Sequence, residues 1–187
     1  MFFPNPPPLS LRLGGRTTID KGRFRPYSPP VMGRLRRTKR KEGIMVQSVE
    51  SVFLARSPHE VFQFVADLRN EPKWHTDVDS VPAGTDPIPV VGKTYPLKFK
   101  PFMGTTDGTL TAVEVQQDAR LVFRGEFGGL KPTISYTVEP AGEGTRFTRS
   151  VELHPSGLKM LMTPVMAFMV PRNNKAVVGN LKRELEA

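Results

Sequence analysis

The side chains that could act as acids or bases in a pocket are few. The histidines of the chain are His59, His75 and His154. His75 follows the single tryptophan, Trp74, and at the mouth of a pocket it could give or take a proton. An exposed surface histidine is the simpler interpretation of His75. We expect His59 to be exposed on the first turn of a helix, and His154 to end a strand.

Arg149 is the charged residue whose spacing is hardest to reconcile with a solvated surface. It alternates with Phe147 and Val151, which places it on the apolar face of a predicted strand. A charge on that face is costly unless it is paired or hydrogen-bonded. Arg149 could pair with Glu114 or Glu126, or it could bind a carboxylate or enolate of a ligand.

Several other kinds of site are excluded by composition and spacing. The chain has no cysteine, which rules out disulfides, thiolate nucleophiles and Cys-ligated metals. No two histidines share helical ligand spacing, so we expect neither a metal nor a cofactor. The segment VVGKT at residues 90–94 resembles the end of a phosphate-binding loop, but position 87 is Pro where that loop requires Gly.

The positive charge of the chain is concentrated at its beginning. Residues 1–43 contain eleven Lys/Arg and two Asp/Glu, whereas residues 44–187 contain 16 of each and are neutral. A neutral body gives no reason to expect nucleic-acid binding, which requires clustered basic residues. We therefore predict a basic extension over residues 1–43 and one ligand-binding domain over residues 44–187.

Residues 1–43 are also rich in proline and glycine, with seven and five of these residues, so we expect disorder. A solvated tail is the favoured interpretation, and contact with nucleic acid or an anionic surface is the lesser one. Met45, directly before the first predicted strand, would be a natural start of the protein. The longest apolar run, residues 160–170, is shorter than a membrane span, and no secretory signal precedes it. We expect a cytoplasmic protein.

Residues 44–187 predict a mixed α and β domain. Residues 46–55 read as a strand, and Ser57-Pro58-His59-Glu60 has the pattern of a capping box that begins a helix. A second short helix through Trp74 follows the break at Asn70 and Pro72. Five further segments of 8–9 residues, separated by turn signals, predict an antiparallel meander: residues 93–100, 108–116, 120–127, 132–140 and 145–153.

The chain ends in a predicted amphipathic helix. Its apolar stripe consists of Met162, Met166, Val170, Val177, Leu181 and Leu185. Pro164 and Pro171 interrupt the stripe, so we expect the early part to be kinked or the helix to start late. The methionines suit either a pocket that accepts varied apolar shapes or a core that they fill.

The order of these elements predicts a hollow. A sheet with one apolar face must cover it, and the last helix is long enough to do so. A curved sheet wrapped around one helix leaves a gap that the two short helices can close at one end. Trp74 would close that end or line the gap, unless it is ordinary core.

Four segments together resemble the polyketide cyclase/dehydrase branch of the START-like superfamily: VESVFLARSPHEVFQFVADLRNEPKWHTDV, VVGKTYPLKF, GTRFTRSVELHPSG and NLKRELE. The resemblance covers about residues 46–187. It implies the helix-grip fold, in which a curved antiparallel sheet wraps around a long C-terminal helix, and a deep hydrophobic pocket. The family has no single catalytic motif to carry over.

We therefore expect binding of a small hydrophobic molecule, such as a lipid or polyketide, between the sheet and the last helix. The alternative is a cyclase or dehydrase acting on an apolar carbonyl substrate, for which His75, Tyr136 and Arg149 are the candidate residues. In either case Tyr136, which has an apolar ring and a polar tip, could orient a ligand oxygen. The expected ligand-binding residues are Trp74, Tyr95, Phe99, Phe123, Tyr136, Arg149, Met162 and Met166.

Overall fold

The computed structural model describes residues 45–102, 105–155 and 157–187. The interpretation of residues 1–43 as a disordered basic extension therefore lies outside the described residues. The strands are β1 (Val46–Leu54), β2 (Val78–Ser80), β3 (Thr94–Phe102), β4 (Thr105–Gln116), β5 (Arg120–Phe127), β6 (Thr133–Ala141) and β7 (Gly144–Leu153). The helices are α1 (Pro58–Ala66), the 3₁₀ turn η1 (Leu68–Asn70), α2 (Glu71–Trp74), the 3₁₀ helix η2 (Gly157–Met162) and α3 (Thr163–Glu186).

The strands form a seven-stranded antiparallel sheet in the order β1-β7-β6-β5-β4-β3-β2. The predicted meander is confirmed, and β1 returns to pair with β7 along its whole length, from Val46 opposite Leu153 to Leu54 opposite Thr145. The short strand β2 was not predicted from the sequence. On the neighbouring strands β6 and β7, Tyr136 and Arg149 lie directly opposite each other, so their side chains emerge on the same face.

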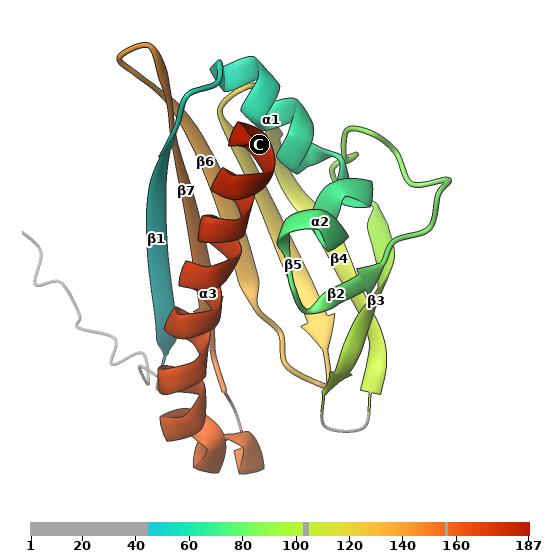
Figure 1. Cartoon of the computed structure of the whole chain (residues 1–187). Coiled ribbons are helices and arrows are strands. Elements are labelled where there is room, and N and C mark those ends of the chain that lie inside the picture. The colour runs from blue at the N-terminus through green and yellow to red at the C-terminus, as the bar shows by residue number, and fades with distance from the viewer. Residues whose placement is uncertain (1–44, 103–104, 156) are drawn as a thin grey trace, which may run out of the picture. The chain divides into compact units, whose positions relative to one another are not determined.

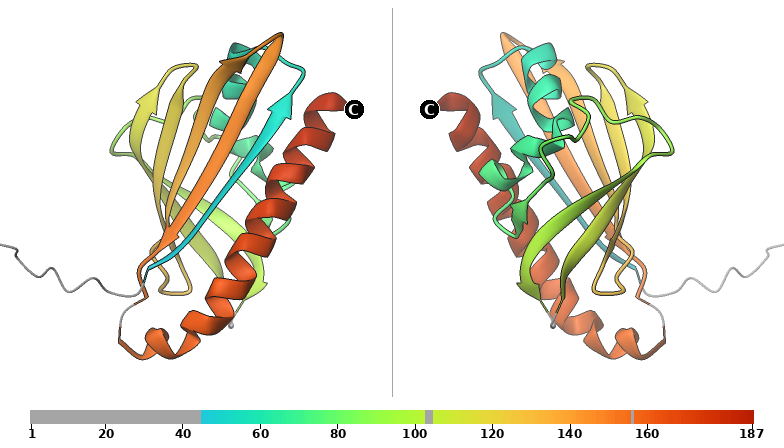
Figure 2. Two further views of the ribbon diagram at one scale, coloured as in Figure 1. Left: turned by 90° about the vertical axis from the view of Figure 1, so that its left-hand side faces the viewer. Right: turned by 90° about the vertical axis from the view of Figure 1, so that its right-hand side faces the viewer.

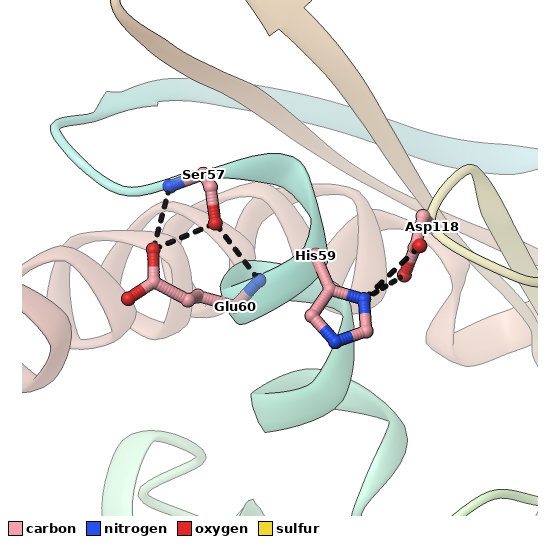
Figure 3. A network of polar contacts seen from close by, with 4 residues as sticks. All are labelled: Ser57, His59, Glu60 and Asp118. Carbon is pink, nitrogen blue, oxygen red and sulfur yellow. Dashed lines mark hydrogen bonds and ion pairs between the residues drawn. The ribbon is translucent and has the colours of Figure 1, made fainter.

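The start of α1 follows from its capping residues, as Figure 3 shows. The Ser57 hydroxyl accepts from the backbone N–H of Glu60, and the Glu60 carboxylate accepts from the backbone N–H of Ser57. The predicted capping box is therefore confirmed. His59 is exposed, as expected, and its Nδ1 lies 3.0 Å from the Asp118 carboxylate in the turn between β4 and β5. This contact connects the first helix to the sheet.

The sheet is curved, and α3 packs along β1 and β7 on its inner side (Figures 1 and 2). The helix starts at Thr163 with Pro164 in its first turn, a position that needs no N–H donor, so the predicted late start is confirmed. Pro171 lies within the helix, which continues through it. No helix among the described residues is long and apolar enough to cross a membrane.

Two groups of buried apolar residues hold the layers together. The larger one joins α1, α2 and the second half of α3 to the sheet. Trp74 lies inside it and packs edge-on against two rings, with its ring centre 5.6 Å from that of Tyr136 and 6.2 Å from that of Phe147. The smaller one joins Val46, Leu153 and Met166 nearer the start of α3. The core is therefore divided along the length of α3.

Candidate functional site

A cavity of about 320 Å³ lies between the inner face of the sheet and the first half of α3. Its volume is at the small end of the range of ligand pockets. Most of its walls are apolar and come from β3 to β7, the β5–β6 turn, η2 and α3: Phe99, Leu110, Phe127, Leu130, Ile134, Val151, Leu153, Met162, Val165, Met166, Met169 and Val170. The predicted hollow between the sheet and the last helix is thus present.

Four polar residues of the cavity wall, His75, Asp77, Arg149 and Asn173, lie where α2 and β2 meet α3, whereas Lys100, Thr109 and Glu126 come from β3, β4 and β5. Arg149, Val151 and Leu153 follow one another along β7, and Asn173, Val170 and Met166 follow one another along α3. His75 and Asp77 belong to the Arg149 and Asn173 end, because His75 contacts Arg149 and Asp77 accepts a hydrogen bond from Asn173. One end of the cavity wall therefore carries these four polar side chains, whereas the wall residues from η2 and the first turns of α3 are apolar.

Arg149 is only 4% exposed, and the side chains that contact its guanidinium are uncharged. Its Nη1 donates to Oδ1 of Asn174 at 2.6 Å, its Nη2 lies 3.1 Å from Nε2 of His75, and its guanidinium lies 6.0 Å from the ring centre of Tyr136. Within the described residues, no carboxylate forms an ion pair with Arg149. Its positive charge also acts on the buried carboxyl of Glu71, and its Nε, which has no hydrogen-bond partner among the described residues, can bond an anion or a carbonyl oxygen.

The expected ion pair of Arg149 with Glu114 or Glu126 is wrong. Glu114 pairs with Arg120 at 3.4 Å, and Glu126 pairs with Lys131 at 3.9 Å. Both side chains are more than a third exposed, so neither carboxylate lies beside the buried guanidinium of Arg149. Apolar alternation correctly placed Arg149 on the inner face, but it did not identify the partners.

His75 is buried, which corrects the simpler expectation of an exposed histidine. Burial, together with the positive charge of Arg149, lowers the pKa of His75 to about 3, so its imidazole is neutral. Because a guanidinium only donates, Nε2 of His75 accepts and Nδ1 carries the hydrogen. The Nδ1 atom and Nε of Arg149 have no hydrogen-bond partner among the described residues. His75 is thus a poor base at neutral pH.

Glu71 is a site residue that the sequence reasoning missed. Its carboxylate is buried at the first position of α2 and accepts from the hydroxyl of Tyr136 at 3.0 Å. Burial raises the pKa of Glu71 to about 7, while Arg149 and the bond from Tyr136 oppose the rise. Burial likewise raises the pKa of Tyr136. The signal available in the sequence was Tyr136 itself, because a buried tyrosine hydroxyl needs a partner.

Asn174 was missed as well. It is 1% exposed in the middle of α3, where its amide nitrogen donates to Oγ of Ser48 at 3.1 Å and to the backbone oxygen of Arg149 at 3.2 Å. Its amide oxygen accepts from Arg149. Position 174 follows Val170 by four residues and precedes Val178 by four, so a polar residue inside the apolar stripe was the available signal.

The structure brings together half of the expected ligand-binding residues at the cavity. Phe99, Arg149, Met162 and Met166 line it. Trp74, Phe123 and Tyr136 belong to the large buried cluster and are not part of the cavity wall. Tyr95 is also in that cluster, and its hydroxyl accepts from the backbone N–H of Val90 at 2.7 Å and donates to Asp86 at 3.0 Å.

Trp74 therefore packs as core, at the end of the sheet that the short helices cover, and does not line the cavity. Its indole Nε1 has no hydrogen-bond partner among the described residues. The described part of the chain also holds no group of three His, Asp or Glu side chains placed to bind a metal ion.

The structure is a curved antiparallel sheet around a long C-terminal helix, with a cavity between them. The chain belongs to the family described as polyketide cyclase / dehydrase and lipid transport, whose model matches residues 45–186. The resemblance stated from the sequence is thereby confirmed. No curated protein sequence matches the chain.

Solved structures share the helix-grip fold at low sequence identity. DynU16, a protein of the dynemicin biosynthetic locus, is 18% identical with a TM-score of 0.59, and the match covers 76% of this chain and 48% of DynU16. TTHA0849 from Thermus thermophilus is 15% identical with a TM-score of 0.57, covering 75% of this chain and 97% of that one. The di-domain ARO/CYC StfQ of the steffimycin pathway is 13% identical with a TM-score of 0.60, covering 76% and 51%. The chain thus spans about half the length of DynU16 and StfQ.

Proposed function

We propose that the protein binds a small hydrophobic molecule with one polar end in the cavity between the sheet and α3. The observation that carries the proposal is the polarity of the cavity: apolar walls along β7 and α3 lead to the buried pair Arg149 and His75. The family, whose description includes lipid transport, supports a ligand of this class.

The length of the cavity wall supports an elongated ligand. The wall residues Arg149 to Leu153 span about 13 Å of extended strand, and Val165 to Asn173 span about 12 Å of helix. Burial of roughly ten methylenes at about 0.8 kcal/mol each corresponds to micromolar affinity without any charged anchor. A carboxylate or carbonyl oxygen near Arg149 would add a charge-assisted hydrogen bond.

The second candidate is a cyclase or dehydrase activity on an apolar carbonyl substrate. Arg149 favours it, because a buried guanidinium at the end of an apolar cavity could stabilise a developing enolate. The fold likeness to the ARO/CYC protein StfQ is consistent with it. His75 does not suit the role of the base, since its low pKa makes the imidazole a weak proton acceptor and its Nε2 already accepts from Arg149.

Binding is tested with a series of fatty acids, the matching alcohols and aromatic polyketides, using thermal shift and native mass spectrometry. Val151→Trp fills the cavity, and Val113→Trp adds the same bulk at an exposed position on β4. We expect ligands to raise the Tm of the wild type and of Val113→Trp but not of Val151→Trp. If no apolar molecule raises the wild-type Tm, the proposal is wrong.

The catalytic candidate has its own test. Turnover of a poly-β-ketone mimic is compared between the wild type, Arg149→Met and Tyr136→Phe. A loss of product with Arg149→Met, while the ligand still binds, supports a role of the guanidinium in the reaction. Equal rates in the three proteins remove both residues from the mechanism.

A further inference from the structure

The outer side of η2 and the first turns of α3 exposes several large apolar side chains. Leu161 is 77% exposed and Phe168 is 69% exposed. We define the outer apolar face by these two residues together with Met160, Val165 and Met169. Single exposed apolar residues are ordinary, but five within ten positions of one segment indicate an interaction surface.

These side chains are separate from the core stripe of α3. At 100° per residue, Val165, Phe168 and Met169 lie on one side of the helix, and Arg172 continues that side one turn later. The buried residues Met166, Asn174, Val177, Val178 and Leu181 lie on the opposite side. The helix therefore presents two apolar stripes, and only one of them is covered by the sheet.

The charged residues of η2 and of α3 up to Arg183 are all basic. From Gly157 to Arg183 the sequence has five Lys/Arg and no Asp/Glu. Arg172 and Lys175 are exposed, and neither has an acidic partner among the described residues. The outer side of α3 is thus apolar in its first turns and basic in the turns that follow.

The outer apolar face also borders the cavity. Val165 and Met169 are both substantially exposed and part of the cavity wall. In Figures 1 and 2, η2 and the first turns of α3 project beyond the end of the sheet. Whatever covers this surface therefore lies against the mouth of the cavity.

We propose that the outer apolar face docks onto an anionic lipid bilayer. Apolar side chains that enter the acyl region beside Lys and Arg at the head groups are the pattern of a helix lying on a membrane surface. The side chains of Arg172 and Lys175 are long enough to reach anionic head groups while the apolar turns are inserted. The surface is a protruding helix edge, which suits a deformable partner.

A second copy of the chain fits this surface less well. A symmetric dimer through the outer apolar face would place four basic side chains, Arg172 and Lys175 of each copy, in or beside the interface, and the segment from Gly157 to Arg183 offers them no acidic partner. Like charges placed together in an interface oppose association. The charge of the face thus favours an anionic surface over self-association.

The test uses the full chain with vesicles of phosphatidylcholine, with and without phosphatidylserine, in a cosedimentation assay. The apolar variant is Leu161→Ser/Phe168→Ser, and its control is Val90→Ser/Val91→Ser, which removes two apolar side chains that are also more than half exposed. The charge variant is Arg172→Glu/Lys175→Glu, and its control is Arg124→Glu/Arg146→Glu at exposed strand positions. Residues 1–43 are present throughout, so their basic charge contributes equally.

We expect the apolar variant to lower the partition onto phosphatidylserine vesicles about tenfold or more, as loss of two inserted side chains requires. The charge variant should remove the dependence on phosphatidylserine and on salt, and both controls should bind like the wild type. Equal binding by all five proteins overturns the proposal. So does sedimentation equilibrium showing a wild-type dimer that Leu161→Ser/Phe168→Ser dissociates. Neither Leu161 nor Phe168 lines the cavity, so ligand binding without vesicles reports separately on the proposed function.

Discussion

The guanidinium of Arg149 donates to the amide oxygen of Asn174 across 2.6 Å, and this bond joins the last strand to the middle of the last helix. Asn174 in turn donates to Ser48 on β1, so three elements far apart in the sequence meet at one buried amide. Because the amide is neutral, this bond forms no ion pair, and the positive charge of Arg149 acts on the buried carboxyl of Glu71 without a direct contact. The contact that fixes α3 on the sheet therefore also holds the guanidinium at the end of the cavity, where the proposed ligand would meet it.

Asn174→Ala should destabilise the fold. The change leaves a buried donor of Arg149 and the hydroxyl of Ser48 without their partner, which costs about 1–3 kcal/mol. The measurement is the free energy of unfolding in urea. Asn173→Ala is the matched control, because Asn173 is only half-buried and donates its hydrogen bond to the exposed Asp77. A double variant Arg149→Met/Asn174→Leu should recover most of the loss, since both polar partners are then gone. Equal stability of the wild type and Asn174→Ala would contradict this account of the bond.

Glu71→Gln should stabilise the protein at neutral and alkaline pH. The folded pKa of about 7 lies above the ordinary value of 4.5, so between these pH values the folded state holds a proton that the unfolded chain has released. The Glu71 contribution to stability therefore falls as pH rises through that window, by about 1.4 kcal/mol per pH unit. Glutamine keeps an acceptor for Tyr136 and has no proton to lose.

The measurement is the difference in unfolding free energy between Glu71→Gln and the wild type from pH 4 to pH 8. It should be near zero below the ordinary pKa of a glutamate and rise to about 3 kcal/mol above the folded pKa. Glu184→Gln, at an exposed position on α3, is the control. A difference that does not change with pH would show that Glu71 does not carry this proton.

His75→Gln should make the protein more resistant to acid. The pKa of His75 in the folded protein, about 3, lies below the ordinary value of 6.5. At pH values between these two, His75 is protonated in the unfolded chain and neutral in the folded protein. The His75 contribution to stability is therefore lost as pH falls through that window. The contribution of Glu71 to stability changes with pH in the opposite direction over part of the same pH window. The effect of His75→Gln is therefore measured in a protein that also carries Glu71→Gln. There, His75→Gln should move the acid-unfolding midpoint to lower pH, while the exposed His154→Gln should not.

The general architecture was predictable because it depends on patterns that repeat along the chain. Alternation gave the inner face of the meander, the capping box gave the start of α1, and the four-residue stripe with Pro164 gave the start of α3. Arg149 was placed on the inner face by the same alternation. Each of these inferences uses only neighbours within one element.

The partners inside the buried network were less accessible to sequence reasoning, since they join different elements. His75 and Glu71 lie in or next to a four-residue helix, where periodicity carries almost no information about which side faces the core. The contact of Glu71 with Tyr136 spans 65 residues, and that of His75 with Arg149 spans 74. The division of the core, which leaves Trp74 and Tyr136 outside the cavity wall, depends on how tightly α1 and α2 pack against the sheet.

Replacement of glycine by alanine should have opposite effects on stability at Gly144 and at Gly179. A Cβ on Gly144, the first residue of β7, would overlap the backbone oxygen of Leu54 and the ring of Phe53, so one end of the β1–β7 pairing depends on the missing side chain. A Cβ on Gly179, which is exposed on α3, meets nothing within 4 Å. Gly144→Ala should therefore cost about 1–3 kcal/mol through a shift of backbone. Gly179→Ala should instead gain about 0.5–1 kcal/mol, because alanine loses less freedom in a helix. Unfolding in urea measures both changes in stability. A stabilising Gly144→Ala would mean that β1 approaches β7 less closely than the structure has it.

The same pair of variants also makes a prediction for ligand binding. Because β1 carries Ser48, the partner of Asn174, a displaced β1 in Gly144→Ala should weaken ligand binding, whereas Gly179→Ala should leave the affinity unchanged.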